Sequence, residues 1–273
     1  MIKDNNIVRV EKMGDVNSLF FKIMDKYLDK IGCCYSLGLD VNFKSTRNGK
    51  SESKEVIDEV VSNYRDLCNI AGLDYRNVVK CGQKHTDNIV VIDNDIDGIC
   101  INDKRFDGVD GMITNRKNVV LATINADCIL MGIYDPKGNI IGNVHSGWRG
   151  TIQRIGVKAI NKMVDVYGCD VRDLIVVMSP SIGKCCFEVG EDVKNLFIEE
   201  FRDIDDNEYI SNRDGKWYID TININRILLK RMGIRDDNIV SSNICSKCNS
   251  DIIHSYRNEG KEYKAESLII GLK

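Results

Sequence analysis

Prolines and histidines are scarce in this chain, with two and three among 273 residues. No proline-rich or glycine/serine-rich linker, internal repeat or low-complexity tract interrupts it. No apolar run approaches the roughly 20 residues that a transmembrane helix needs. The N-terminal segment MIKDNNIVRV is too polar for a secretory signal peptide. These absences favour a cytoplasmic protein with no membrane partner, organised as a single domain over residues 1–273.

Charge and cysteine content exclude further classes of function. The formal net charge of -3 leaves no basic excess to neutralise phosphates, so we expect no nucleic-acid partner. The eleven cysteines are an odd number, and two of the pairs, Cys33–Cys34 and Cys185–Cys186, are sequence neighbours, which is awkward for disulfide geometry. We therefore expect free thiols in a reducing compartment, most of them packed as small apolar groups.

Hydrophobic periodicity predicts helices and strands in an irregular order. The expected helices span residues 51–71, 151–167, 189–201 and 221–232, and the expected strands span 78–81, 89–92, 119–124, 129–134, 140–144 and 174–178. Strands cluster centrally, and helices interrupt them without a regular βαβ alternation. This order favours an α+β fold in a single domain, with mixed β-sheets flanked by helices.

The segment DPKGN at residues 135–139 marks a turn between two expected strands. Its proline presets φ at the first central position, and Gly138 can take the left-handed conformation that follows. In the resulting hairpin, Cys128 and His145 lie about equally far from the turn, to within a one-residue bulge. We expect them to be cross-strand neighbours with Cβ atoms about 5 Å apart. A thiol and an imidazole so placed suit zinc, or copper as the second choice.

A third ligand has to come from elsewhere, and two histidines remain. His85 lies between two expected strands, and His254 lies in the segment IIHSYR near the end of the sequence. Either would complete a set of two histidines and one cysteine with one open position, which is typical of catalytic rather than structural zinc. The alternative is a cysteine and a histidine that serve only packing and capping. Spacing alone leaves these alternatives open.

The glycine-rich segment SGWRG follows His145 and leads into an expected helix. Glycines let a backbone approach a ligand closely, and helix N-terminal amides favour anions. The candidate phosphate-binding residues of this segment are Ser146, Gly147, Arg149 and Gly150. The Arg149 guanidinium suits phosphate or carboxylate. The alternative is a strand-to-helix turn with Trp148 in the core and the arginine on the surface.

Six motifs together resemble a known family. They are GQKHTDNI (82–89), DGMITN (110–115), NADC (125–128), VHSGWRGT (144–151), SPSIGKCCFEVGEDV (179–193) and IIHSYRNEG (252–260). In this order they resemble the YfiH-like family, also called the peptidoglycan editing factor or "polyphenol oxidase laccase" family, over roughly residues 30–270. One family segment like FSTR corresponds here to YSLGLDVNF (35–43), which has no arginine in place.

The resemblance implies a single α/β domain with mixed sheets and one zinc ion. Carried over residue by residue, the metal ligands are His85, Cys128 and His145, which selects His85 over His254. The implied activities are purine nucleoside and methylthioadenosine phosphorolysis and adenosine deamination, with a purine nucleoside such as inosine or adenosine and phosphate as partners. Removal of wrongly incorporated serine from peptidoglycan precursors is also implied. Arg257, in the last motif, is expected near the substrate; the alternative is a segment that only caps the surface.

We expect the three metal ligands and Arg149 to carry catalysis in a monomer or homodimer. Asp127 is a weak proton-shuttle candidate, because in a strand it should point away from Cys128. A laccase centre of four copper ions is excluded, since three histidines cannot ligate it. The pair Cys245–Cys248 lacks a second CxxC to complete a zinc ribbon, so we interpret it as packing or loose chelation, with a redox role as the alternative.

Two other functions fit the same residues. Cys128 and His145 could act as the nucleophile and base of an amide hydrolase. Alternatively, the protein is a non-enzymatic, zinc-stabilised regulator of cell-wall synthesis.

Overall fold

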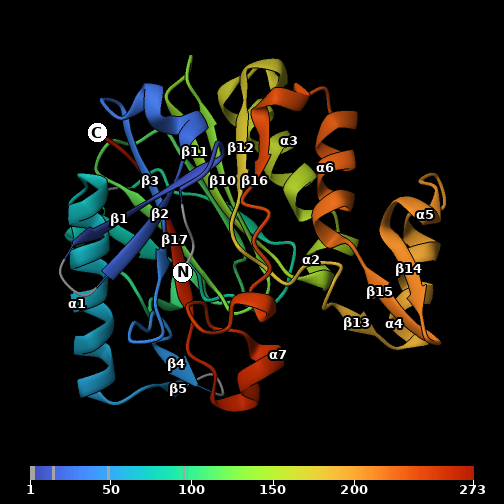
Figure 1. Ribbon diagram of the computed structural model, residues 1–273. Coiled ribbons are helices and arrows are strands. Elements are labelled where there is room, and N and C mark those ends of the chain that lie inside the picture. The colour runs from blue at the N-terminus through green and yellow to red at the C-terminus, as the bar shows by residue number, and fades with distance from the viewer. Residues whose placement is uncertain (1–3, 14–15, 48–49, 95, 97) are drawn as a thin grey trace.

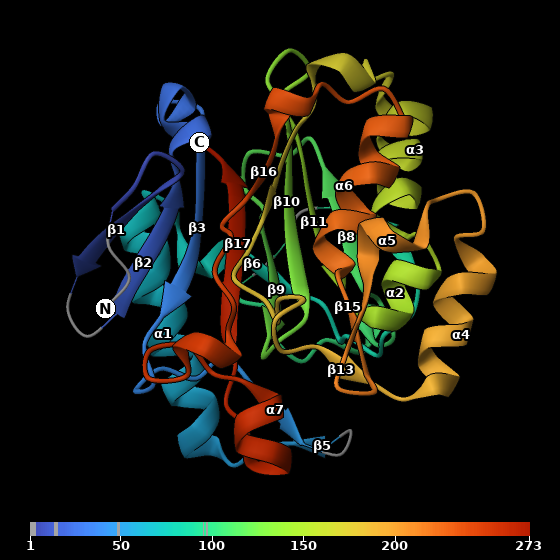
Figure 2. The same cartoon turned by 45° about the vertical axis from the view of Figure 1, so that its right-hand side comes forward.

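The computed structural model describes residues 4–13, 16–47, 50–94, 96 and 98–273, and two six-stranded sheets form its centre (Figures 1 and 2). The first sheet runs through β1 (Val8–Met13), β2 (Val16–Phe21), β3 (Ile31–Leu37), β17 (Glu266–Leu272), β9 (Val120–Asn125) and β6 (Val78–Lys80). The second runs through β16 (Ile239–Ser241), β12 (Ile175–Met178), β10 (Ile129–Asp135), β11 (Ile140–Ser146), β8 (Gly111–Thr114) and β7 (Ile89–Val91). Both are mixed, because β6–β9, β7–β8 and β12–β16 pair in parallel and the other neighbours are antiparallel.

The two sheets pack face to face, and helices cover their outer faces (Figure 2). Helix α1 (Lys54–Ala71) lies on the first sheet, and α3 (Ile155–Tyr167) and α6 (Thr221–Arg231) lie on the second. The core between the sheets contains side chains from both, including Leu268 and Leu130. The prediction of an α+β fold with mixed sheets flanked by helices is confirmed.

Helix α1 illustrates how the sequence fixes an element. Its buried residues Val60, Tyr64 and Leu67 recur at helical spacing and pack against the first sheet. The Ser53 hydroxyl accepts a backbone N–H of the first turn, and Gly72 ends the helix in the left-handed conformation at φ 69°. The helix therefore begins after this cap, three residues later than the periodicity predicts.

The remaining elements are short. They are β4 (Thr46–Arg47), β5 (Lys50–Ser51), α2 (Trp148–Ile152), α7 (Tyr256–Glu259), and a small outer sheet of β13 (Glu188–Val189), β15 (Lys216–Ile219) and β14 (Ile210–Arg213) beside α4 (Glu191–Glu200) and α5 (Asp206–Tyr209). The 3₁₀ helices are η1 (Lys22–Tyr27), η2 (Tyr75–Asn77), η3 (Lys104–Phe106), η4 (Val171–Asp173), η5 (Asp236–Asn238), η6 (Lys247–Asn249) and η7 (Gly260–Glu262).

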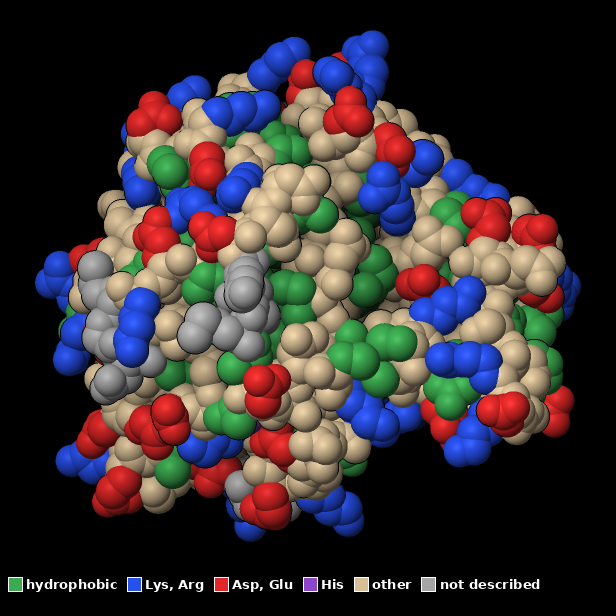
Figure 3. All heavy atoms as spheres, in the orientation of Figure 1, with side chains coloured by type: hydrophobic (Ala, Val, Ile, Leu, Met, Phe, Trp, Pro, Cys, Tyr) green, Lys and Arg blue, Asp and Glu red, His purple; other side chains and the backbone are tan. Residues whose placement is uncertain are grey.

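Within the described residues, every helix is too short or too polar to cross a membrane. On the face in Figure 3, acidic and basic side chains are interspersed rather than gathered into one basic surface.

Two local predictions were wrong, although each expected strand is present with ends shifted by one or two residues. The helix expected over 151–167 is two helices, because Arg154 takes the left-handed conformation at φ 57° between α2 and α3. In the hairpin turn the left-handed residue is Asn139, at φ 51°, and not Gly138. The Asp135 carboxylate fixes this turn by accepting the next two available backbone N–H groups.

A buried asparagine links the two sheets. Asn143 is fully buried in β11, and its side-chain amide donates to the carbonyls of Leu121 in β9 and Leu268 in β17. Its amide oxygen accepts the Thr123 hydroxyl at 2.6 Å. The side chain thus gives the buried Thr123 hydroxyl a partner and adds hydrogen bonds to two backbone carbonyls of the opposite sheet.

Replacing Asn143 by leucine should lower the free energy of unfolding by about 2–3 kcal/mol, because it removes three buried hydrogen bonds and leaves the Thr123 hydroxyl without this partner. Urea denaturation measures the change. Asn161→Leu, at an exposed position of α3, is the control and should shift stability by less than about 0.5 kcal/mol. Equal stability of Asn143→Leu and wild type would contradict the role given to this side chain.

Candidate metal centre and active site

A cleft of about 910 Å³ opens at the end of the second sheet where β11 finishes and β10 begins. Each predicted metal ligand lines it: His145 from the end of β11, Cys128 just before β10, and His85 from the loop between β6 and β7. Their donor atoms all lie within 4.8 Å of one another. Cys128 Sγ is 3.8 Å from His85 Nε2, and the two imidazole rings meet edge to face with centroids 4.9 Å apart.

The hairpin register differs from the prediction. His145 pairs with Leu130, so Cys128 is displaced by two residues and is not its direct cross-strand partner. Side chains two residues apart along a strand share a face, so the thiol still reaches the imidazole diagonally. The sequence therefore predicted correctly that this thiol and this imidazole meet, but it predicted the wrong register for the two strands.

Asp110 organises this site and was missed as a functional residue. Its fully buried carboxylate lies 2.7 Å from His145 Nδ1 and accepts the backbone N–H groups of Lys84, His85 and Thr86. Its carbonyl accepts the backbone N–H of His145. The Asp110 carboxylate thereby orients the His145 imidazole directly and positions His85 through its backbone. Because it occupies Nδ1 of His145, the Nε2 atom of that ring is left to face the cleft.

The ionisable groups favour a charged cluster. Burial alone would raise the pKa of Asp110, but hydrogen bonds from His145 and from backbone amides lower it to about 2. Burial likewise opposes ionisation of Cys128, yet the charge and hydrogen bonds of His145 and His85 lower its pKa to about 6. Burial would lower the pKa of His145, and the Cys128 thiolate and Asp110 raise it to about 9. A thiolate is the form that binds a metal ion or acts as a nucleophile.

The backbone around the ligands is tightly constrained. His85 and Asp127 have φ of 60° and 88°, in the left-handed region that non-glycine residues rarely adopt. A Cβ at Gly147 would lie 2.7 Å from His85 Cδ2 and 3.0 Å from Cys128 Sγ. Glycine at this position therefore lets the chain pass directly beside both ligands.

The other predicted site residues have different surroundings. Arg149 is exposed at the cleft, with its guanidinium 4.1 Å from the centre of the Trp148 ring. Ser146 also lines the cleft, but its hydroxyl pairs with Thr151. Gly150 is buried, and a Cβ there would meet Ile155. The substrate roles predicted for these residues stay predictions.

The C-terminal motif closes one side of the cleft. Arg257 lines it, and its guanidinium donates to the carbonyls of Cys186 and Glu188. Its backbone N–H donates to the Asp127 carboxylate, which also accepts the Ser246 hydroxyl. Asp127 therefore holds the C-terminal segment against the loop that carries Cys128.

His254 lies outside the cluster of predicted metal ligands. Its ring is buried, with Nε2 3.0 Å from the Val41 carbonyl and Nδ1 3.1 Å from the Glu259 carboxylate. Its backbone N–H donates to the buried carboxyl group of Glu266. Burial, with the nearby charges of Glu259 and Asp127, raises the pKa of Glu266 well above its usual range.

Residues 38–271 match the family described as "Multi-copper polyphenol oxidoreductase laccase". The chain belongs to this family. The crystal structure of the hypothetical protein YfiH from Bacillus licheniformis has the same fold, with a TM-score of 0.79 at 23% identity over 97% of this chain and 99% of that one. The resemblance to the YfiH-like family is thereby confirmed.

Two curated relatives carry enzyme names. The mouse protein "Purine nucleoside phosphorylase LACC1" is 30% identical over 84% of this chain and 52% of its own length. "Adenosine deaminase RL5", from an unknown prokaryotic organism, is 31% identical over 69% of this chain and 72% of its own length. The chain therefore spans about half of the mouse relative and nearly three quarters of the prokaryotic one.

Asp110→Asn should weaken the binding of added zinc by the three predicted ligands about 10- to 100-fold, because it removes the anion that orients His145. Competition with a chromophoric chelator measures the affinity. Asp107→Asn is the matched control: this exposed carboxylate in the same loop pairs with Lys84 and should leave the affinity unchanged. Equal affinity in the two variants would rule out the orienting role of Asp110.

Glu266→Gln should raise the melting temperature relative to wild type at pH 8 but not below about pH 4.3. The unfolded glutamate ionises near this pH, whereas the fold retains the proton to higher pH. Its stabilising contribution is therefore complete below the unfolded pKa and is lost as pH rises, and glutamine has no proton to lose. Thermal melts at both pH values test this, with exposed Glu208→Gln as the control. A pH-independent difference would contradict it.

Proposed function

We propose that this protein is a zinc-dependent purine nucleoside enzyme that catalyses phosphorolysis of inosine, adenosine or methylthioadenosine and deamination of adenosine. The observation that carries the proposal is the convergence of two imidazoles and one thiol within 4.8 Å at the base of a large cleft. A nucleophile–base pair needs one imidazole, whereas a metal centre uses both. The names of the relatives indicate the substrate class.

The donor set fits zinc best. His85, Cys128 and His145 offer two nitrogens and one sulfur, which leaves a fourth tetrahedral position for a reactant. Copper is the second choice, because one thiolate with two imidazoles also suits a single copper ion. When bound, zinc would supply a Lewis acid that activates water near neutral pH.

The cleft also fits a nucleoside and an anion. Its volume lies within the range of small-molecule sites, and the rings of Trp148, Phe187, Tyr256 and Tyr263 offer surfaces for a purine. Basic side chains outnumber acidic ones along its described lining, six to three, in a chain whose net charge is negative. The basic residues are Lys44, Lys80, Lys84, Lys104, Arg149 and Arg257, and the acidic ones are Asp103, Asp107 and Asp127. This excess favours phosphate binding.

In phosphorolysis, phosphate attacks C1′ of the ribose while the purine leaves, and positive charge develops on the sugar. Arg149, with the backbone amides of residues 146–150, would bind the phosphate and orient it for this attack. Asp110 would keep His145 in one orientation throughout, since it holds Nδ1. Arg257 would contact the substrate from the opposite segment, where backbone carbonyls already fix its guanidinium.

Three further proposals come from the sequence. We propose that residues 1–273 act as one domain, supported by the shared core between the sheets, and as a monomer or homodimer. Editing of peptidoglycan precursors stays a prediction of the family resemblance.

One rival function is favoured by a specific contact. His145 lies between Cys128 and Asp110, the order of groups in a cysteine hydrolase triad. Metal analysis separates the two functions, because a bound ion would occupy the thiolate. A zinc-free protein that hydrolyses amides and is inactivated by alkylation of Cys128 would support the rival. Loss of thermal stability on chelation without turnover of any nucleoside would support the non-enzymatic regulator instead.

Cys128→Ala and His85→Ala should each bind one zinc ion fewer per chain than wild type. Both should lose inosine phosphorolysis and adenosine deamination by about 10³-fold, since Lewis-acid activation contributes several kcal/mol. Mass spectrometry of metals and the two assays measure these losses. Cys100→Ala, a half-buried thiol away from the ligands, is the matched control and should keep both metal and activity. A fully active Cys128→Ala protein without this ion would refute the proposed function.

A further inference from the structure

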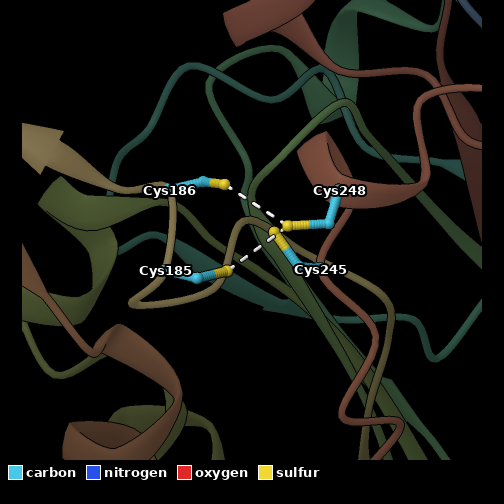
Figure 4. Close-up of side chains that lie close together, drawn as sticks. All are labelled: Cys185, Cys186, Cys245 and Cys248. Atoms are coloured by element: carbon cyan, nitrogen blue, oxygen red, sulfur yellow. Dashed lines mark hydrogen bonds between the residues drawn. The ribbon is translucent and has the colours of Figure 1, made fainter.

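Four cysteines that are distant in sequence meet beside the outer sheet. Cys185 and Cys186 lie in the turn before β13, and Cys245 and Cys248 lie between β16 and α7 (Figure 4). Their four Sγ atoms all lie within 4.8 Å of one another. Cys248 Sγ is 3.6 Å from that of Cys185 and 3.5 Å from that of Cys186. Figure 4 shows the side chains converging from two separate segments.

Neither packing nor a disulfide accounts for this cluster. Thiols that serve as apolar packing, such as Cys33 and Cys81, are buried in the core between the sheets. By contrast, Cys185 and Cys248 are exposed. A disulfide requires an S–S distance of about 2.05 Å, far shorter than these separations.

We propose that these four thiols bind a Zn²⁺ ion in a closed, tetrahedral four-cysteine site. Zn–S bonds of about 2.3 Å place the sulfurs of such a site about 3.8 Å apart, close to the two short separations found here. Residues 245–248 supply the C-x2-C spacing common in zinc sites, and the adjacent pair supplies the other two ligands. Four thiolates leave no open position, so the role of this ion is structural.

The surroundings suit a negatively charged metal–thiolate centre. The backbone N–H of Gly183 donates to Cys245 Sγ at 3.3 Å, and a Cβ at Gly183 would lie 3.3 Å from Cys185 Sγ. The Arg213 guanidinium donates to the carbonyl of Cys185, and that of Arg257 donates to the carbonyl of Cys186. Four thiolates and Zn²⁺ carry a net charge of about -2, which N–H donors and nearby cations offset.

The proposed ion would hold one wall of the cleft. Ser181 already forms a β-bridge with Cys245, and Ser246 contacts the Asp127 carboxylate beside Cys128. Phe187, next to the adjacent thiols, lines the cleft. An ion bound by cysteines of both segments would therefore hold this wall more firmly than these hydrogen bonds do. The site itself does not depend on the proposed nucleoside activity.

Zinc content per folded chain tests the proposal, using full-length protein purified under reducing conditions. Wild type should hold two zinc ions, and both Cys128→Ala and the double variant Cys245→Ser/Cys248→Ser should hold one. A variant with all three changes should hold none. The control Cys100→Ser/Cys169→Ser changes two thiols outside both metal-ligand groups and should keep two ions.

Cobalt spectroscopy identifies the ligands. Co²⁺-loaded Cys128→Ala should keep intense thiolate-to-cobalt charge transfer from four sulfurs, and Cys245→Ser/Cys248→Ser should lose it. If the double variant does not fold, the single variant Cys185→Ser and the zinc content of Cys128→Ala still test the four-cysteine site.

A folded Cys128→Ala protein without zinc would overturn the four-cysteine site. So would iron with inorganic sulfide in place of zinc, or a disulfide among these cysteines under reducing conditions. One retained zinc in Cys128→Ala, with no nucleoside turnover by wild type, would uphold this site and refute the proposed activity.

Discussion

The buried contact between Asp110 and the imidazole of His145 is the interaction on which the site depends. The same carboxylate accepts the backbone N–H groups at the start of the His85 loop, so one anion joins this loop to the end of β11. Because the group is fully buried, its charge is retained only through these hydrogen bonds. Two of the three predicted ligands thus take their positions from a residue that is not itself a predicted ligand.

The convergence of the three predicted ligands could be read from the sequence because the signal was partly local. A turn motif placed Cys128 and His145 at one end of a hairpin, and the order of motifs selected His85. The register could not be predicted, since a turn sequence does not determine where the paired strands stop. Asp110 carried little signal of chemistry, because a single acidic residue before a short strand resembles a loop residue. Its place in the motif DGMITN was the only indication.

Capped amphipathic helices such as α1 were readable, whereas β3 and β17 were not predicted. Their sequences, IGCCYSL and ESLIIGL, are buried on both faces and show no alternation, and the two strands pair with each other across most of the chain. The four-cysteine cluster could not be predicted for the same reason. Its two halves are about 60 residues apart, and only the packing of loops at the ends of β12 and β16 brings them together.

The first sheet places β17 between β3 and β9, although β17 follows both in chain order. Until residues 266–272 leave the ribosome, the nascent chain carries two halves of a sheet, each with an unpaired apolar edge. Such edges are templates for association with other chains. Closure of this sheet therefore has to wait for β17, and until then the facing edges of β3 and β9 stay open to association with other chains.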